Sequence, residues 1–235
     1  LWTVFCRIKA SQGLIGPTGI DLEATVVFST HGLIPLTAAA ASFVLAGLVH
    51  RTAPDKRLGR AFGFLALTLV FWNLNIFALS AFDDYASALE YSRLFRTGSL
   101  FLLPAVLHLA LVLPGRPIPL VWRAVLILDY AVSAFLAVVN VRGGLVTELE
   151  SYYRGFYSVG SPLYDLFTIS LVANFLASAI LMIREYVITE NPRMRLQLKF
   201  WLFGIAVALP LGVTNVLPVY GINIYPLGNL GSAVL

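Results

Sequence analysis

Six long apolar runs with almost no charge, followed by the opening of a seventh, dominate this chain. A helix needs roughly 17–25 predominantly apolar residues to cross a hydrocarbon core about 30 Å thick, and each run meets that requirement. Asp129 is the one charged residue inside these runs. The pattern predicts an all-α polytopic membrane protein, a bundle of six complete transmembrane helices plus the start of a seventh. The runs are Leu33–Val49, Ala61–Phe82, Thr97–Gly115, Ala124–Val141, Leu166–Ile183 and the uncharged stretch from Phe200 to Leu235.

The last uncharged stretch must be divided, because its 36 residues would form a helix of about 54 Å. Two prolines, Pro218 and Pro226, and Gly221 between them interrupt helical hydrogen bonding. We therefore predict helix six over about Leu196–Leu217 and the start of helix seven near Pro226. The remaining Leu227–Leu235 is less than half a span, so we expect the sequence to be part of a longer chain. Its first residue is not Met, which indicates an amino end that is incomplete, processed or unusually started.

Composition agrees with a membrane protein. Hydrophobic residues make up 59% and charged residues 12% of the chain, against roughly 45–50% and 25% in soluble domains. We divide the chain into an extracytoplasmic amino-terminal segment, residues 1–32, and a seven-helix transmembrane domain, residues 33–235, with helix seven truncated. The net charge is +4, but the basic residues lie at the ends of the apolar runs, where they bind lipid headgroups. We therefore expect no nucleic-acid partner.

The distribution of Lys and Arg between alternate connections predicts the orientation. The first, third and fifth connections, with their flanking helix ends, hold ten of these residues, and the other side holds six. Cytoplasmic loops carry the excess of Lys and Arg. The odd connections should therefore be cytoplasmic, with the amino terminus outside. The ten residues are Arg51, Lys56, Arg57, Arg60, Arg116, Arg123, Arg184, Arg193, Arg195 and Lys199.

The longest connection, Val141–Ser161, is rich in aromatic residues and lies on the predicted outer side. Two interpretations stay open. It could form part of an interfacial aromatic belt, which Tyr and Trp populate in membrane proteins generally, or it could cap an external ligand pocket. The acidic second connection, from Asp83 to Glu90, is predicted to be a solvated surface. The candidate cap residues are Tyr152, Tyr153, Phe156 and Tyr157.

Small residues at four-residue spacing predict close packing between helices. Gly204, Ala208 and Gly212 share one face of helix six. In lipid, such faces let two backbones approach closely, so that van der Waals contacts drive association. This signal concerns architecture rather than chemistry. Similar faces carry Ala38, Ser42 and Ala46 on helix one, and Ser170, Asn174 and Ser178 on helix five.

His108 and Asp129 are the candidate switch residues, because polar and ionisable residues inside a bilayer are usually functional. His108 lies eight residues before Arg116 and Asp129 six residues after Arg123. Both therefore lie about 9–12 Å inward on antiparallel neighbouring helices. A His–Asp pair there would lower the cost of burying the carboxylate and could act as a proton-linked switch. The alternative is packing alone, an interhelical hydrogen bond worth about 0.6–2 kcal/mol. Asn73, Asn75, Asn174 and Asn215 are predicted to join helices in the same way.

Nothing in the sequence predicts an enzyme active site. His31, His50 and His108 are scattered, and no His or Cys spacing suits a metal ion. Nucleotide-binding glycine motifs and a nucleophile elbow do not occur. A retinal protein would need a Schiff-base lysine in helix seven, whereas Lys199 is the last lysine of the sequence given. We therefore predict no catalytic residues, no metal and no cofactor for this segment.

Three stretches resemble the amino-terminal seven-helix region of bacterial sensor histidine kinases. The most specific is Asn215–Ser232, at the passage from helix six to helix seven. Pro104–His108, followed by Leu113–Gly115, resembles the third helix of that family, and Asn191–Lys199 the start of the sixth. The resemblance covers roughly Leu33–Leu235. It implies a multi-pass input module in a bacterial cytoplasmic (inner) membrane, ahead of cytoplasmic kinase, PAS or cyclic-dinucleotide output domains. The chain departs from a whole kinase in having no phospho-acceptor His box and no ATP-binding domain.

The leading hypothesis is a sensory or signalling module without catalysis of its own. A ligand or a membrane state would bias two packings of the bundle, and helix seven would pass the change to a cytoplasmic output domain. Helices that carry Pro104, Pro210 or Pro218 are the candidate moving elements. The alternative is an accessory or structural subunit of a larger bacterial membrane complex. A transporter is the third hypothesis, weakened by the lack of an evident repeat. Expected partners are the lipid bilayer, an output domain or other subunits, and, as an option left open, a second copy of the chain.

Overall fold

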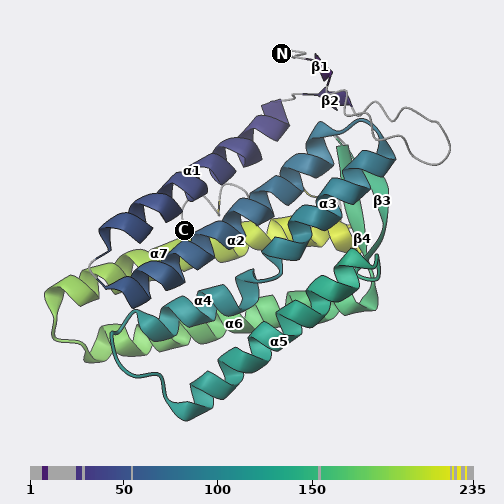
Figure 1. The fold of residues 1–235 in the computed structure, drawn as a ribbon. Helices are drawn as coiled ribbons and strands as arrows, with labels where there is room; N and C mark the ends of the chain where they lie inside the picture. The colour runs from purple at the N-terminus through teal and green to yellow at the C-terminus, as the bar shows by residue number, and fades with distance from the viewer. Residues whose placement is uncertain are drawn as a thin grey trace.

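The computed structural model is a bundle of roughly aligned helices with a short β-hairpin at one end (Figure 1). It describes residues 7–9, 25–27, 30–53, 55–152, 155–222, 224, 227, 228 and 231. The elements in chain order are β1 Arg7–Lys9, β2 Thr25–Val27, α1 Thr30–Thr52, α2 Lys56–Ala81, α3 Tyr85–Ser99, α4 Leu102–Val112, α5 Leu120–Val141, β3 Val146–Tyr152, β4 Gly155–Gly160, α6 Pro162–Ile188, α7 Pro192–Val216 and the 3-10 helix η1 Leu217–Tyr220.

Six helical segments of the described chain are long and apolar enough to cross a membrane, which confirms six of the predicted spans. Their outward faces carry large apolar side chains that a bilayer would cover, including Phe43, Leu120, Ile127, Ile169, Phe200 and Phe203, each more than 60% exposed. The six segments are Gly32–Thr52, Lys56–Ala81, Tyr85–Val112, Leu120–Val141, Pro162–Ile188 and Pro192–Tyr220.

The third span differs from its prediction in starting earlier and in being broken. Asp84 caps α3, since its Oδ1 accepts a 2.7 Å hydrogen bond from the backbone N–H of Ser87. The residues up to Glu90, predicted as solvated connection, are therefore largely helical. A turn at Leu100 and Phe101 then separates α3 from α4. Pro104 explains the turn, because it has no N–H to donate to the carbonyl of Leu100.

The centre of the bundle is α4, which packs against α2, α5 and α6. Every residue of α4 except His108 is buried. By contrast, α1 packs chiefly against α2, and α7 against α6. A ring contact between Phe62 of α2 and Trp201 of α7, 6.3 Å between centroids, joins the two sides of the bundle.

The two ends of the bundle differ in structure. At the hairpin end lie the α2–α3 connection, the β3–β4 hairpin and η1 (Figure 1, right). At the basic end lie the end of α1, the start of α2 and the connections formed by residues 113–119 and 189–191 (Figure 1, left). The predicted odd connections thus share one end, and the even ones share the other.

The antiparallel β3–β4 hairpin stands where the sequence predicted a loop, and its register pairs Leu149 with Ser158 and Glu150 with Tyr157. A register shift between Val146 and Glu148 disturbs the alternation of polar and apolar residues, which weakens the sequence signal for a strand. Gly155 has φ +144 and lies against the end of α2, where a Cβ atom would touch the carbonyl oxygen of Leu79.

The predicted end of helix six is confirmed. α7 ends at Val216 and passes into η1, which stops at Gly221. Gly221 has a left-handed φ of +76, a conformation that favours glycine at a helix end. Most of the predicted helix seven lies outside the described residues. Of those described there, Leu227 donates its N–H to Thr214 Oγ1 at 2.7 Å, and Gly231 donates to the carbonyl of Leu227 at 3.4 Å.

Most residues of the predicted small faces lie inside the bundle. Gly204 and Ala208 are buried and Gly212 is half-buried. A Cβ atom on Gly231 would lie 3.1 Å from the Cα of Ala208, so this face meets the start of the segment predicted as helix seven. On the other two faces, Ala38, Ser42, Asn174 and Ser178 are buried, and Ala46 and Ser170 are half-buried.

Candidate functional site

Polar side chains from four elements converge on a small cavity beneath β4 at the hairpin end. The cavity has a volume of about 20 Å³, enough for roughly one water-sized occupant. Asn75 of α2, Arg96 of α3, Tyr157 of β4 and Asn215 of α7 contribute to its lining. We call this space the polar cavity. Its other lining residues are Trp72, Ile76, Leu79, Ser99, Tyr164, Phe167 and Val219.

Arg96 is the most unusual residue of the polar cavity, because its charged side chain is only 6% exposed. Its Nη2 donates a 2.6 Å hydrogen bond to the hydroxyl of Ser158 on β4. Its guanidinium carbon lies 5.6 Å from the ring centroid of Tyr164, a cation–π contact. Within the described residues no carboxylate forms an ion pair with Arg96. A positive charge is thus buried against neutral partners.

Three buried polar atoms around the polar cavity have no hydrogen-bond partner in the described part of the chain. They are Nη1 of Arg96, Oδ1 of Asn75 and Nδ2 of Asn215. Asn75 is 6% and Asn215 3% exposed, so solvent does not satisfy these groups. Buried polar groups in native proteins are almost always hydrogen-bonded. Their concentration around one cavity indicates a place for a polar occupant.

The hairpin forms the roof of the polar cavity and is fastened to α3. Arg93 Nη2 donates to the carbonyl of Val146 at 2.9 Å, and Asn140 of α5 donates to the carbonyl of Arg93 at 2.7 Å. Tyr85 accepts a 3.2 Å hydrogen bond from the N–H of Leu149 through its hydroxyl. These contacts hold β3 against the beginning of the third span.

The predicted cap residues have different positions. Phe156 packs edge-on against Tyr85, with ring centroids 6.0 Å apart. Tyr157 is buried and donates its hydroxyl hydrogen to the carbonyl oxygen of Asn215. Tyr152 ends β3, but its side chain is not described, and Tyr153 lies outside the described residues. Tyr157 therefore lies under the hairpin and within the polar cavity.

Asn215 connects the hairpin with the segment predicted as helix seven. Its backbone carbonyl accepts from Tyr157. Its side-chain Oδ1 accepts a 2.8 Å hydrogen bond from the N–H of Gly228. A Cβ atom on Gly228 would overlap the Asn215 amide, so the two residues are in direct contact. One residue of α7 thus contacts both the roof of the polar cavity and the start of the following segment.

The predicted pairing of His108 with Asp129 is wrong. His108 Nδ1 lies 2.9 Å from the hydroxyl of Tyr130, the residue after Asp129. Asp129 instead lies beside the Asn174 amide of α6. Successive residues of a helix point about 100° apart, so only one of Asp129 and Tyr130 can face α4. The helix spacing placed His108 and this turn of α5 at the same level of the bundle, as the contact with Tyr130 shows, but it could not determine how α5 is rotated.

A second, apolar cavity of about 210 Å³ lies between α2, α4, α6 and α7. Ala208 and Gly212 form part of its wall, together with Trp72 and Phe175. Trp72 lines both cavities. The small face of α7 therefore borders open apolar space as well as neighbouring backbone.

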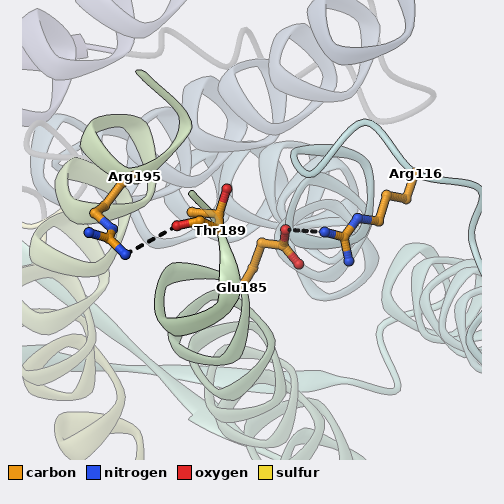
Figure 2. A network of polar contacts seen from close by, with 4 residues as sticks. All are labelled: Arg116, Glu185, Thr189 and Arg195. Carbon is orange, nitrogen blue, oxygen red and sulfur yellow. Dashed lines mark hydrogen bonds and ion pairs between the residues drawn. The ribbon is translucent and has the colours of Figure 1, made fainter. Parts of the chain in front are cut away.

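At the basic end, the last turn of α6 is held from two sides (Figure 2). Arg116 Nη2 forms a 3.1 Å ion pair with Glu185 Oε1. Arg195 of α7 donates to the carbonyl of Thr189 at 3.1 Å, and its guanidinium covers the ring of Tyr186. Arg116 is 62% exposed and Glu185 11%. These contacts fix the α4–α5 connection and α7 to one helix end.

The sequence did not single out Arg96, because it was counted among the basic residues of an outer connection. A signal was present, since Arg96 directly precedes the uncharged run Thr97–Gly115. Snorkelling to the surface is the usual arrangement for such a residue, so burial was not expected.

The family of the chain follows from its sequence as a whole. A family model for the N-terminal 7TM region of histidine kinase matches residues 34–235. The chain belongs to this family. The match covers the bundle from α1 to η1 and confirms the resemblance carried by Asn215–Ser232. No curated protein matches the chain. As a 7TM region of histidine kinases, the bundle is a membrane sensory domain rather than a catalytic one.

Proposed function

We propose that this 7TM region is the input module of a signalling protein. The module detects a ligand at the hairpin end and relays the resulting conformational change to a cytoplasmic output domain. In this proposal the hairpin end faces the outside of a bacterial cytoplasmic membrane and the basic end faces the cytoplasm. The excess of Lys and Arg at the basic end supports that orientation. Family membership supports the sensory role.

The contact chain through Asn215 is the observation that carries the proposal. A change in the polar cavity acts on Tyr157, whose hydroxyl is bonded to Asn215. Asn215 in turn holds Gly228, where the seventh helix of the family would start. A ligand that favours one position of the hairpin would thereby favour one position of that helix. The change needed is small, because packed interfaces shift between discrete arrangements.

The test uses the full-length protein in membrane vesicles and measures the activity of its cytoplasmic domain, as phosphate transfer from labelled ATP where that domain is a kinase. Tyr157→Phe removes the hydroxyl bonded to Asn215 and keeps the ring. We expect it to change the basal output roughly 5-fold or more, the lower end of typical coupling between sites. Tyr91→Phe is the matched control, because Tyr91 is partly exposed and stacks on Phe82.

Two results would contradict the relay. One is an output unchanged by Tyr157→Phe. The other is that the full-length protein has no output domain and purifies in a fixed ratio with other membrane proteins. That result would support the accessory-subunit alternative.

A further inference from the structure

We propose that the polar cavity binds a small anion, either a halide ion or the carboxylate group of a larger molecule, with Arg96 as its counter-charge. The inference rests on the proposed function, since it names the chemistry of the ligand that the input module detects. It is supported by charge, by unpaired donors and by size.

Charge is the first argument. Arg96 is buried, and its described partners are the neutral Ser158 hydroxyl and the Tyr164 ring. A buried charge without an opposite charge is strongly unfavourable. Among the described residues, none that lines the polar cavity is acidic. An anion in the cavity would supply the missing negative charge.

The unpaired atoms are the second argument. Arg96 Nη1 and Asn215 Nδ2 are both hydrogen-bond donors without a partner among the described residues. Donors that converge beside a guanidinium form strong charge-assisted hydrogen bonds to anions. A metal cation would instead need several oxygen ligands of negative charge, which this lining does not offer. Asn75 Oδ1, the third unpaired atom, could accept from a bridging water.

Size limits the anion. A volume of about 20 Å³ holds roughly one water-sized body, which suits a monatomic halide or one oxygen of a carboxylate group. A tetrahedral oxyanion such as phosphate or sulfate exceeds it. A molecule that binds through its carboxylate would have to leave its remaining atoms outside the cavity, toward the hairpin.

The experiment measures anion-dependent stability in the purified full-length protein in detergent micelles. Sodium isethionate is replaced stepwise by sodium chloride, bromide or formate at constant ionic strength, and the thermal unfolding midpoint is recorded. We expect a saturable rise with at least one of these ions. A halide response without a formate response assigns a halide site, and the reverse assigns a carboxylate site. Bromide should also quench the fluorescence of Trp72, which lines the cavity, and this quenching should be absent in Trp72→Phe.

Two variants locate the effect. Arg96→Gln should raise the half-maximal anion concentration roughly tenfold or more, the loss expected for one charge-assisted hydrogen bond. Asn215→Asp keeps the oxygen that Gly228 needs and places a carboxylate beside Arg96. It should make the unfolding midpoint independent of added anion, and it stays informative if Arg96→Gln does not fold. Arg142→Gln removes an exposed charge near the hairpin and should leave the response unchanged.

A midpoint that does not depend on the anion in the unmodified protein would overturn the inference, as would a full response in Asn215→Asp. The outcome is separate from that of the signalling proposal. Anion binding without any change in output supports the site and contradicts the relay. If an uncharged molecule controls the output and none of the three anions changes the unfolding midpoint, the anion site is contradicted and the relay is not.

Discussion

The hydroxyl of Tyr130 is the polar partner of His108 inside the bundle, at 2.9 Å from Nδ1. The two rings meet edge-on with centroids 6.1 Å apart, and Tyr130 also packs on Phe64. The ring packing of Tyr130 is therefore separable from its hydrogen bond, because substitution by Phe keeps the first and removes the second.

We expect Tyr130→Phe to lower the free energy of unfolding by about 0.6–2 kcal/mol, the range for a hydrogen bond between membrane helices. Unfolding by sodium dodecyl sulfate in mixed micelles measures it, with Tyr91→Phe as the control. A double-mutant cycle of Tyr130→Phe with His108→Leu should show coupling. The cycle of His108→Leu with Asp129→Asn should show less, since Asp129 lies beside Asn174 instead. Equal coupling in the two cycles would contradict the structure.

At this scale the sequence predicted which polar residues belong to the spanning helices, but not their partners. Apolar residues occur on every side of α4 and α5, so periodicity contains little information on rotation. The same limit hid the polar cavity, whose lining residues Asn75, Arg96, Tyr157 and Asn215 are up to 140 positions apart in the chain, as their numbers show.

At the scale of elements, α3 is held against α2 through a glycine. Gly98 lies against the ring of Phe71 so closely that a Cβ atom there would overlap the ring atoms. The contact lies directly before the turn at Leu100 and Phe101, which separates α3 from α4. A larger residue at position 98 would therefore push apart the two helices that support the hairpin.

We expect Gly98→Ala to destabilise the bundle by about 1–3 kcal/mol, the usual cost of overpacking. Gly47→Ala is the matched control, because nothing lies within 4 Å of a Cβ atom at that position of α1. Alanine also favours a helix over glycine by roughly 0.5–1 kcal/mol, so the control should be neutral or stabilising. The free energy of unfolding of the two variants is measured in detergent. If Gly98→Ala were as stable as Gly47→Ala, the packing of α2 on α3 would be contradicted.

The existence of each spanning helix could be predicted because length and lack of charge are sufficient for it. The hairpin could not, since the register shift at Val146 and Glu148 removes a clean alternation of polar and apolar residues. The early start of α3 was also missed. Asp84 was interpreted as part of an acidic surface, although an Asp followed by a helix-compatible stretch is equally typical of an N-cap.

At the scale of the whole molecule, the odd and even connections lie at opposite ends of the bundle (Figure 1). The basic end contains the exposed Arg116 and the charged start of α7. The hairpin end places Arg96 inside and fastens Arg93 to the hairpin. Arg96 at least is therefore not free to bind headgroups.

Reporter fusions test the orientation. Fusions after Arg57 and after Asn191 should behave as cytoplasmic, and fusions at Asp83 and at Tyr153 as external. An enzyme active only outside the membrane and a fluorescent protein that folds only inside give opposite signals, which controls for expression. A cytoplasmic signal from the hairpin would reverse the orientation and place the polar cavity on the inner side.

Asn215 accepts one hydrogen bond from Tyr157 and another from Gly228, and this has a consequence for what lies beyond the membrane. A free energy that couples two sites is the same in both directions. If an anion under the hairpin changes the position of Gly228, then whatever binds or locks the segment after Gly228 must change the affinity for that anion by the same factor. We therefore expect the apparent affinity of the hairpin end for the anion to depend partly on what the segment after Gly228 binds in the cytoplasm. One protein would then have different detection thresholds in its resting and its active state.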